Sequence, residues 1–441
     1  MVSAVTAYLC LIITLLAVAT YAFYVTYLSP RFGTPQKLYV LLIALFYQLI
    51  SIAAELTAIG GLMVLLAPDV SKAWAIIIVS VITCSYTLFG TRSRGIKASI
   101  ATDAIKGGFV LLLVVIICIA AFSYTALPVD AFATTGVAAF TTTGFEAVFT
   151  LTIAIVSSNL FLTGFWLRTF AAKNNADLRK ACAYAALAAT PFIVLLGVVG
   201  FMGFIMHPEA PVFDGGFFFY ILLDMPEAWS VLVLIVVAAL VSSTADTVQT
   251  GMSAEILSHF QSRLSLTTAR LISVVINIPA IFIALTDTSV LKLFLIADLL
   301  CAATVGPIFL GIWKRTHPWA VLAGCVSGLV TVLFVRLLYT VSGSHNAMVQ
   351  IFVSGWTREG NFVDGFKEFV LEEGLFTTHS MVLFILTLVI PIVVTVGLTF
   401  ALPPAPKRRT PQNDHADLLV DAPVNHTSDH HFEATKSPAV V

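Results

Sequence analysis

The stretch that decides the fold runs from Trp229 to Thr250 and reads WSVLVLIVVAALVSSTADTVQT. Its first half is apolar. The whole stretch has 22 residues, close to the about 20 that a helix needs to cross a bilayer. Its second half becomes polar in a regular way, because Ser243, Asp246, Thr247 and Thr250 fall at i, i+3, i+4 and i+7, on one face of a helix. The stretch therefore predicts a membrane-spanning helix with one oxygen-rich face.

Two uses of that face follow from its chemistry. Hydroxyls beside a carboxylate suit a small hard cation, because such ions prefer oxygen ligands. The same hydroxyls can instead bond their own helix or hold neighbouring helices together. Sequence spacing leaves both interpretations open.

The composition of the whole chain is that of a membrane protein. Of its 441 residues, 59% are hydrophobic and 11% are charged, and the mean hydropathy is +0.98. A soluble domain has roughly 25% charged residues. The 23 Lys and Arg nearly balance the 24 Asp and Glu, so nothing predicts a nucleic-acid partner. The six cysteines form no CxxC pair, so neither a disulfide framework nor a bound metal is predicted.

Long apolar runs recur along the chain, and they are continuous rather than alternating, which favours helices over a β-barrel. We therefore expect an all-α polytopic protein of the plasma membrane. Eleven such runs lie at 3–27, 38–66, 73–90, 98–124, 146–167, 181–206, 229–250, 266–286, 290–313, 318–341 and 378–402.

Basic residues set the expected orientation. Every second loop along the chain is rich in Lys and Arg, and the loops between them are poor in both; the loop 207–228 contains none. Because cytosolic loops carry the excess of Lys and Arg, the N-terminus is predicted outside and the C-terminus in the cytosol. Residues 1–402 form the predicted transmembrane domain, and 403–441 a disordered cytosolic tail that is too poor in apolar residues to fold.

Several ionisable residues fall inside the predicted spans. Such residues usually face a cavity or one another, because a charge in hydrocarbon is costly; each one alone fits a structural ion pair equally well. Asp103 lies roughly 8 Å from the cytosolic edge, at about 1.5 Å per residue, in the same half of the bilayer as 243–247. We interpret Asp298 as capping or pairing locally, and Arg336 as reaching the interface. The residues concerned are Glu55, Asp103, Lys106, Asp246, Asp298 and Arg336.

Four stretches together resemble the sodium/solute symporter family. They occur in the family's order and lie in or beside the corresponding spans, and the resemblance covers most of residues 1–340. They are 26–33 (TYLSPRFG), 95–103 (GIKASIATD), 166–173 (WLRTFAAK) and 243–246 (STAD).

The resemblance implies a LeuT-like inverted-repeat fold with five helices in each half and solute bound near the midplane. It also implies that the span 146–167 is a broken helix that contacts solute. By position, Ser243 and Thr244 match the hydroxyls that bind the coupling sodium, and Asp103, Asp246 and Thr247 match a second cation site. The implied solute pathway contains Glu55, Ser158, Asn159 and Thr163.

The chain departs from the family at two points. The match begins at the family's third span, so its first two helices have no counterpart, and we expect weak or absent sodium coupling from this chain alone. Lys106 stands where the family often has glutamine. Its ammonium, three residues from Asp103, is a possible cation surrogate that would make transport proton-linked or uncoupled; the alternative is an ammonium that reaches water at the cytosolic boundary.

The predicted function is therefore secondary active transport, with a small polar solute carried by alternating access in symport with sodium or a proton. No enzymatic activity and no cofactor are expected, since the chain has no P-loop, GxSxG, HExxH or Rossmann fingerprint. The alternatives are a non-transporting remnant that partners a full-length symporter, and an uncoupled facilitator or channel. The solute stays open among urea, polyamines, amino acids, sugars and carboxylates, although the NLFLTGFW stretch at 159–166 is similar to the branch of urea and polyamine carriers.

Overall fold

The computed structural model describes residues 34–89, 95–125, 139–170, 174–209, 216–260, 264–286, 289–311, 315–343 and 378–403, with a few isolated positions between them. The predicted span at 3–27 and nearly all of the predicted tail lie outside the described residues. Every regular element in these ranges is helical. The elements are α2 (Thr34–Leu66), α3 (Lys72–Phe89), α4 (Gly95–Tyr124), α6 (Thr142–Asn159), α7 (Thr163–Phe170), α8 (Asn175–Met206), α9 (Phe217–Tyr220), the 3-10 turn η1 (Ile221–Asp224), α10 (Glu227–His259), α11 (Leu266–Leu285), α12 (Val290–Leu310), α13 (Pro318–Gly343) and α16 (Thr378–Ala401).

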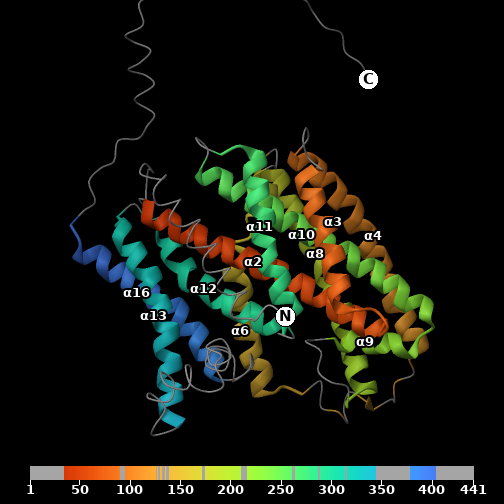
Figure 1. Cartoon of the computed structure of the whole chain (residues 1–441). Coiled ribbons are helices and arrows are strands. Elements are labelled where there is room, and N and C mark those ends of the chain that lie inside the picture. The colour runs from red at the N-terminus through yellow and green to blue at the C-terminus, as the bar shows by residue number, and fades with distance from the viewer. Residues whose placement is uncertain are drawn as a thin grey trace, which may run out of the picture. The chain divides into compact units, whose positions relative to one another are not determined.

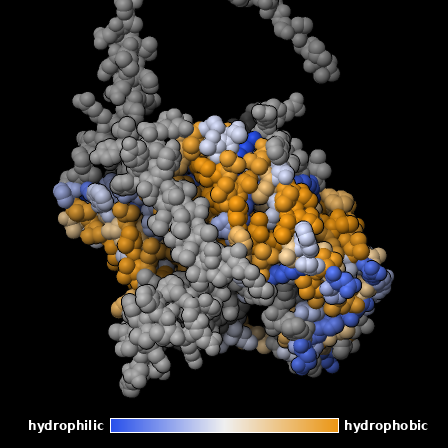
Figure 2. Space-filling view, viewed as in Figure 1, coloured by the Kyte–Doolittle hydropathy of each residue, from blue (hydrophilic) through white to orange (hydrophobic). Residues whose placement is uncertain are grey.

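The chain is an integral membrane protein. Seven of the described helices, namely α2, α4, α8, α10, α11, α12 and α16, are long and apolar enough to cross a membrane. The other predicted spans after the first coincide with α3, α13 and the pair α6 and α7, so the total of eleven stays a prediction. Figure 2 shows apolar side chains over much of the described surface on one face, where lipid would cover them.

Two helices form the centre of the bundle. The apolar windows of α2 and α12 are 61% and 67% buried within the protein, more than those of the other candidate spans. Helix α2 contacts α3, α10, α11 and α12, and Figure 1 shows it passing between α12 and the pair α10 and α11. Their packing buries leucine and alanine side chains such as Leu45, Leu49 and Ala297. A polar side chain on the buried face of α2 or α12 is therefore removed from both lipid and bulk water.

The predicted span at 146–167 is interrupted. Helix α6 ends at Asn159 and α7 begins at Thr163, and the three residues between them make turn-like bonds, with the Phe161 amide donating to the Ser158 carbonyl at 2.9 Å. The indole Nε1 of Trp166 donates to the free Leu160 carbonyl at 2.8 Å. The side chain of Phe161 is buried, so apolar burial holds the linker inside the bundle while local bonds satisfy its backbone.

Candidate functional site

The oxygen-rich face of α10 points into the protein. Asp246 and Thr247 are 4% and 9% exposed, and the Thr247 hydroxyl donates to the Ser243 carbonyl at 2.9 Å. The Thr244 hydroxyl lies close enough to hydrogen-bond the carboxyl of Glu55 on α2. Of the two uses inferred for this face, bonding to its own helix holds for Thr247, whereas Thr244 faces a carboxylate of another helix.

Helix α7 rests directly on the backbone of α10 beside that face. A Cβ added to Gly164 would lie 2.5 Å from the Thr247 carbonyl oxygen, and a Cβ added to Gly251 would lie 2.6 Å from the Gly164 nitrogen. The Gln48 Oε1 atom of α2 is 2.9 Å from the same Gly251 Cβ position. Only glycine permits so close an approach, and three helices therefore meet where the broken span resumes.

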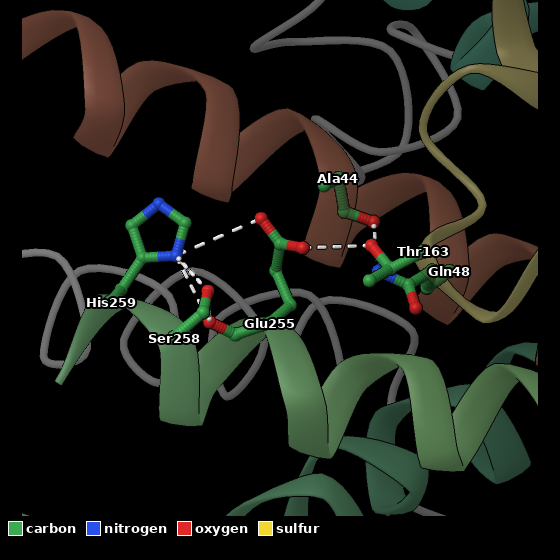
Figure 3. Close-up of polar contacts among 6 residues, drawn as sticks. All are labelled: Ala44, Gln48, Thr163, Glu255, Ser258 and His259. Atoms are coloured by element: carbon green, nitrogen blue, oxygen red, sulfur yellow. Dashed lines mark hydrogen bonds and ion pairs between the residues drawn. The ribbon is translucent and has the colours of Figure 1, made fainter. Parts of the chain in front are cut away.

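A polar network ties the first turn of α7 to the last turns of α10 (Figure 3). The Thr163 hydroxyl donates to Glu255 Oε2 at 2.8 Å. The other oxygen, Oε1, lies 3.7 Å from Nδ1 of His259, whose ring nitrogen also lies 2.9 Å from the Glu255 carbonyl. Figure 3 shows Glu255 between His259 on one side and Thr163 and Gln48 on the other. These contacts hold the first turn of α7 against the last turns of α10.

A second contact joins the end of α6 to both central helices. Ser158 is 2% exposed; its hydroxyl donates to the Ile155 carbonyl at 3.4 Å and lies beside Tyr47 on α2 and the carboxyl of Asp298 on α12. The local interpretation of Asp298 is therefore incomplete, because its carboxyl faces two other helices. Asn159, predicted in the solute pathway, is exposed, and its amide donates to the Ile155 carbonyl at 2.8 Å.

The structure thus brings some predicted residues together and leaves others apart. Glu55 meets Thr244, and Ser158 and Thr163 flank the break, whereas Asn159 bonds within its own helix. Helix α4 packs against α10, as their shared depth suggests, but the side chain of Asp103 lies outside the described residues, and Lys106 is partly buried. No cluster of His, Cys, Asp or Glu suited to a metal occurs in the described part of the chain.

Sequence reasoning missed three residues of this region. Glu255 lies beyond the predicted end of its span at 250, but α10 continues to His259. A signal existed, because Thr247, Gly251 and Glu255 follow at i, i+4 and i+8, on one face of a helix. Gln48 and Tyr47 of α2 carry no comparable pattern, since their roles depend on which helices pack against α2.

Comparison with known proteins adds one relative. No family model matches the chain. It is 28% identical over 356 residues to a protein of Candida albicans named spermidine transporter DUR31, and this match covers 79% of the present chain. The match spans 64% of the length of that curated relative.

Proposed function

We propose that this chain is a secondary active transporter of the sodium/solute symporter type, which carries a small cationic solute such as a polyamine together with sodium or a proton. One observation carries the proposal: a predicted membrane span is interrupted, and the interruption meets polar side chains of two long helices inside the bundle. In carriers with broken helices, irregular backbone at membrane depth occurs where it borders a site or a water-filled cavity.

The electrostatics of the interior favour a cationic solute. Among the fully buried residues of the described ranges, the charged side chains are Asp246 and Asp298. Glu55 and Glu255 are partly buried between helices, as are the bases Lys72, Lys106 and Arg270, none of which is fully buried. Acidic groups held away from water lower the free energy of a cation entering the bundle and raise that of an anion. The name of the Candida albicans relative is in keeping with this charge, and spermidine is the solute to test first.

The coupling cation is assigned to the face of α10. Thr244 and the Glu55 carboxyl supply oxygen atoms from two helices, and Ser243 precedes them on the same turn. A second cation would lie toward α4, with Asp246 and Asp103 as its ligands. These positions lie on helices that contact the broken span, so a bound cation would stabilise one arrangement of α7 against α10, and the solute would share that preference.

Uptake into proteoliposomes tests the proposal. The purified full chain is reconstituted, and accumulation of radiolabelled spermidine is measured with an inward sodium gradient, an inward proton gradient and no gradient. Accumulation above equilibrium under either gradient, absent from empty liposomes, supports symport. Equilibration without accumulation would identify a facilitator or channel instead. Uptake that requires an added full-length relative would identify a non-transporting partner.

A further inference from the structure

Asp298 is a buried carboxylate that the contacts described so far leave incompletely satisfied. The residue is 7% exposed, and its Oδ1 atom has no hydrogen-bond partner among the described residues. It lies on α12, where Ala297, Cys301 and Ala302 are completely buried around it. The carboxylate is therefore shielded from bulk solvent by the packing of its own helix.

The side chains that the structure describes around Asp298 include no partner of opposite charge. No Lys or Arg whose side chain the structure describes forms an ion pair with Asp298; the Ser158 hydroxyl lies beside its carboxyl, and Tyr47 and Cys301 lie within range of its charge. A buried carboxylate costs much more than one hydrogen bond returns unless a cation or a proton neutralises it. The carboxyl is therefore neutralised either by a proton or by a positively charged occupant, and Oδ1, which has no donor among the described residues, is the atom such an occupant would contact.

The chemistry of the neighbouring side chains indicates which kind of cation would bind. The rings of Tyr47 and Phe294 lie 6.4 Å apart between centroids, and Phe294 is one helical turn before Asp298, on the same side of α12. An alkali ion prefers a shell of many oxygens, whereas a substituted ammonium has three donors at most and gains further from aromatic faces. Asp298, Ser158 and Tyr47 offer three acceptors beside two aromatic rings.

We infer that Asp298, with Ser158 and Tyr47, forms a binding subsite for the ammonium group of an organic amine. This inference rests on the proposed function for the view that the amine is cargo; the binding itself does not depend on transport. The subsite draws on α2, α12 and the last turn of α6. An amine bound there contacts the end of the broken span, so its occupancy would bias the position of α6 against the two central helices.

Binding to the purified full chain tests the subsite separately from transport. The midpoint of thermal unfolding in detergent is measured with spermidine, with butylamine, and with sodium chloride against potassium chloride. Both amines are expected to raise the midpoint, and Asp298→Asn should weaken their apparent affinity at least about 10-fold, the loss of one charged contact. Asp69→Asn, an exposed acid between α2 and α3, is the matched control and should bind as the wild type does.

Each outcome of the binding experiment either supports or overturns the amine subsite. Stabilisation by sodium alone that Asp298→Asn abolishes would replace the amine by an alkali ion and overturn the assignment, as would unchanged amine affinity in that variant. If Asp298→Asn does not fold, Tyr47→Phe and Ser158→Ala serve, because each removes one acceptor; unchanged affinity in both rejects the subsite. A chain that binds amines at Asp298 but moves none of them would refute the proposed transport while leaving the subsite intact.

Discussion

The hydroxyl of Thr163 donates a 2.8 Å hydrogen bond to Oε2 of Glu255, and this contact joins two segments that are 92 residues apart in the chain. Thr163 is the first residue of α7, the second half of a broken span, whereas Glu255 lies one turn from the end of α10. The bond therefore links the start of α7 to the helix that carries the proposed cation ligands.

Removing this hydroxyl should loosen the junction. Thr163→Val keeps the shape of the side chain but leaves Glu255 Oε2 without its donor, and an acceptor left unsatisfied in this way costs about 1–3 kcal/mol. The midpoint of thermal unfolding of the purified protein should fall accordingly. Thr169→Val on the same helix is the control, because the Thr169 hydroxyl bonds its own Phe165 carbonyl at 3.0 Å. Equal midpoints for the two variants would mean that the Thr163 bond contributes nothing.

A methyl group at the contact between α7 and α10 should be costly. In Gly164→Ala, the added Cβ would lie 2.5 Å from the Thr247 carbonyl oxygen, which no rotation of a side chain can relieve, and overpacking of this kind costs about 1–3 kcal/mol. The measurement is thermal unfolding together with spermidine uptake, and we expect both to fall.

The matched control is Gly197→Ala in α8, where an added Cβ meets nothing within 4 Å. This variant should be neutral or more stable by about 0.5–1 kcal/mol, since alanine favours a helix over glycine. A Gly164→Ala protein as stable as Gly197→Ala would show that α7 does not press on α10.

The positions of the helices are well predicted from the sequence, because the apolar composition that marks a membrane helix lies within one continuous segment. The error at α10 has a simple cause: residues 251–259 are too polar for a span, so the apolar window ends at 250 although the helix continues to His259. The break between Asn159 and Thr163 is hidden for the opposite reason. Its residues Leu160, Phe161 and Leu162 are apolar, and hydropathy alone cannot separate a buried linker from a buried helix; only the resemblance to a transporter family suggested it.

Contacts between helices lie beyond what spacing can predict. The face that contains Thr244 is visible as a repeat, but its partner Glu55 is known only once α2 packs against α10. Asp298 illustrates the same limit, because local pairing is the simplest expectation for an isolated acid, and the hydroxyl beside its carboxyl belongs to Ser158 of α6. Non-local packing decides which polar groups share a site.

Lys106 offers a test of the cation-surrogate hypothesis. If its ammonium occupies the place of a coupling ion near the start of α4, Lys106→Gln vacates that place, and spermidine uptake should become more dependent on sodium. The measurement is initial uptake rate against sodium concentration at constant ionic strength. Lys37→Gln, which removes an exposed ammonium at the start of α2, should leave the sodium profile as it is. Identical profiles for Lys106→Gln and the wild type would remove the surrogate role.

The pair formed by Thr244 and Glu55 should set the affinity for the coupling cation. Thr244→Val deletes an oxygen ligand while preserving volume, and the loss of one such contact is worth roughly 1.4 kcal/mol, or about 10-fold in affinity. The sodium or proton concentration that gives half-maximal spermidine uptake should rise by that factor, whereas spermidine binding to the ion-saturated protein should hardly change. Thr267→Val, on the exposed first turn of α11, is the matched control. Thr244 and Glu55 are assigned to one cation site, so the double variant Glu55→Gln/Thr244→Val should lose less cation affinity than the sum of the two single losses. Additive losses would place Thr244 and Glu55 at separate sites and would contradict the assignment of the cation to this face of α10.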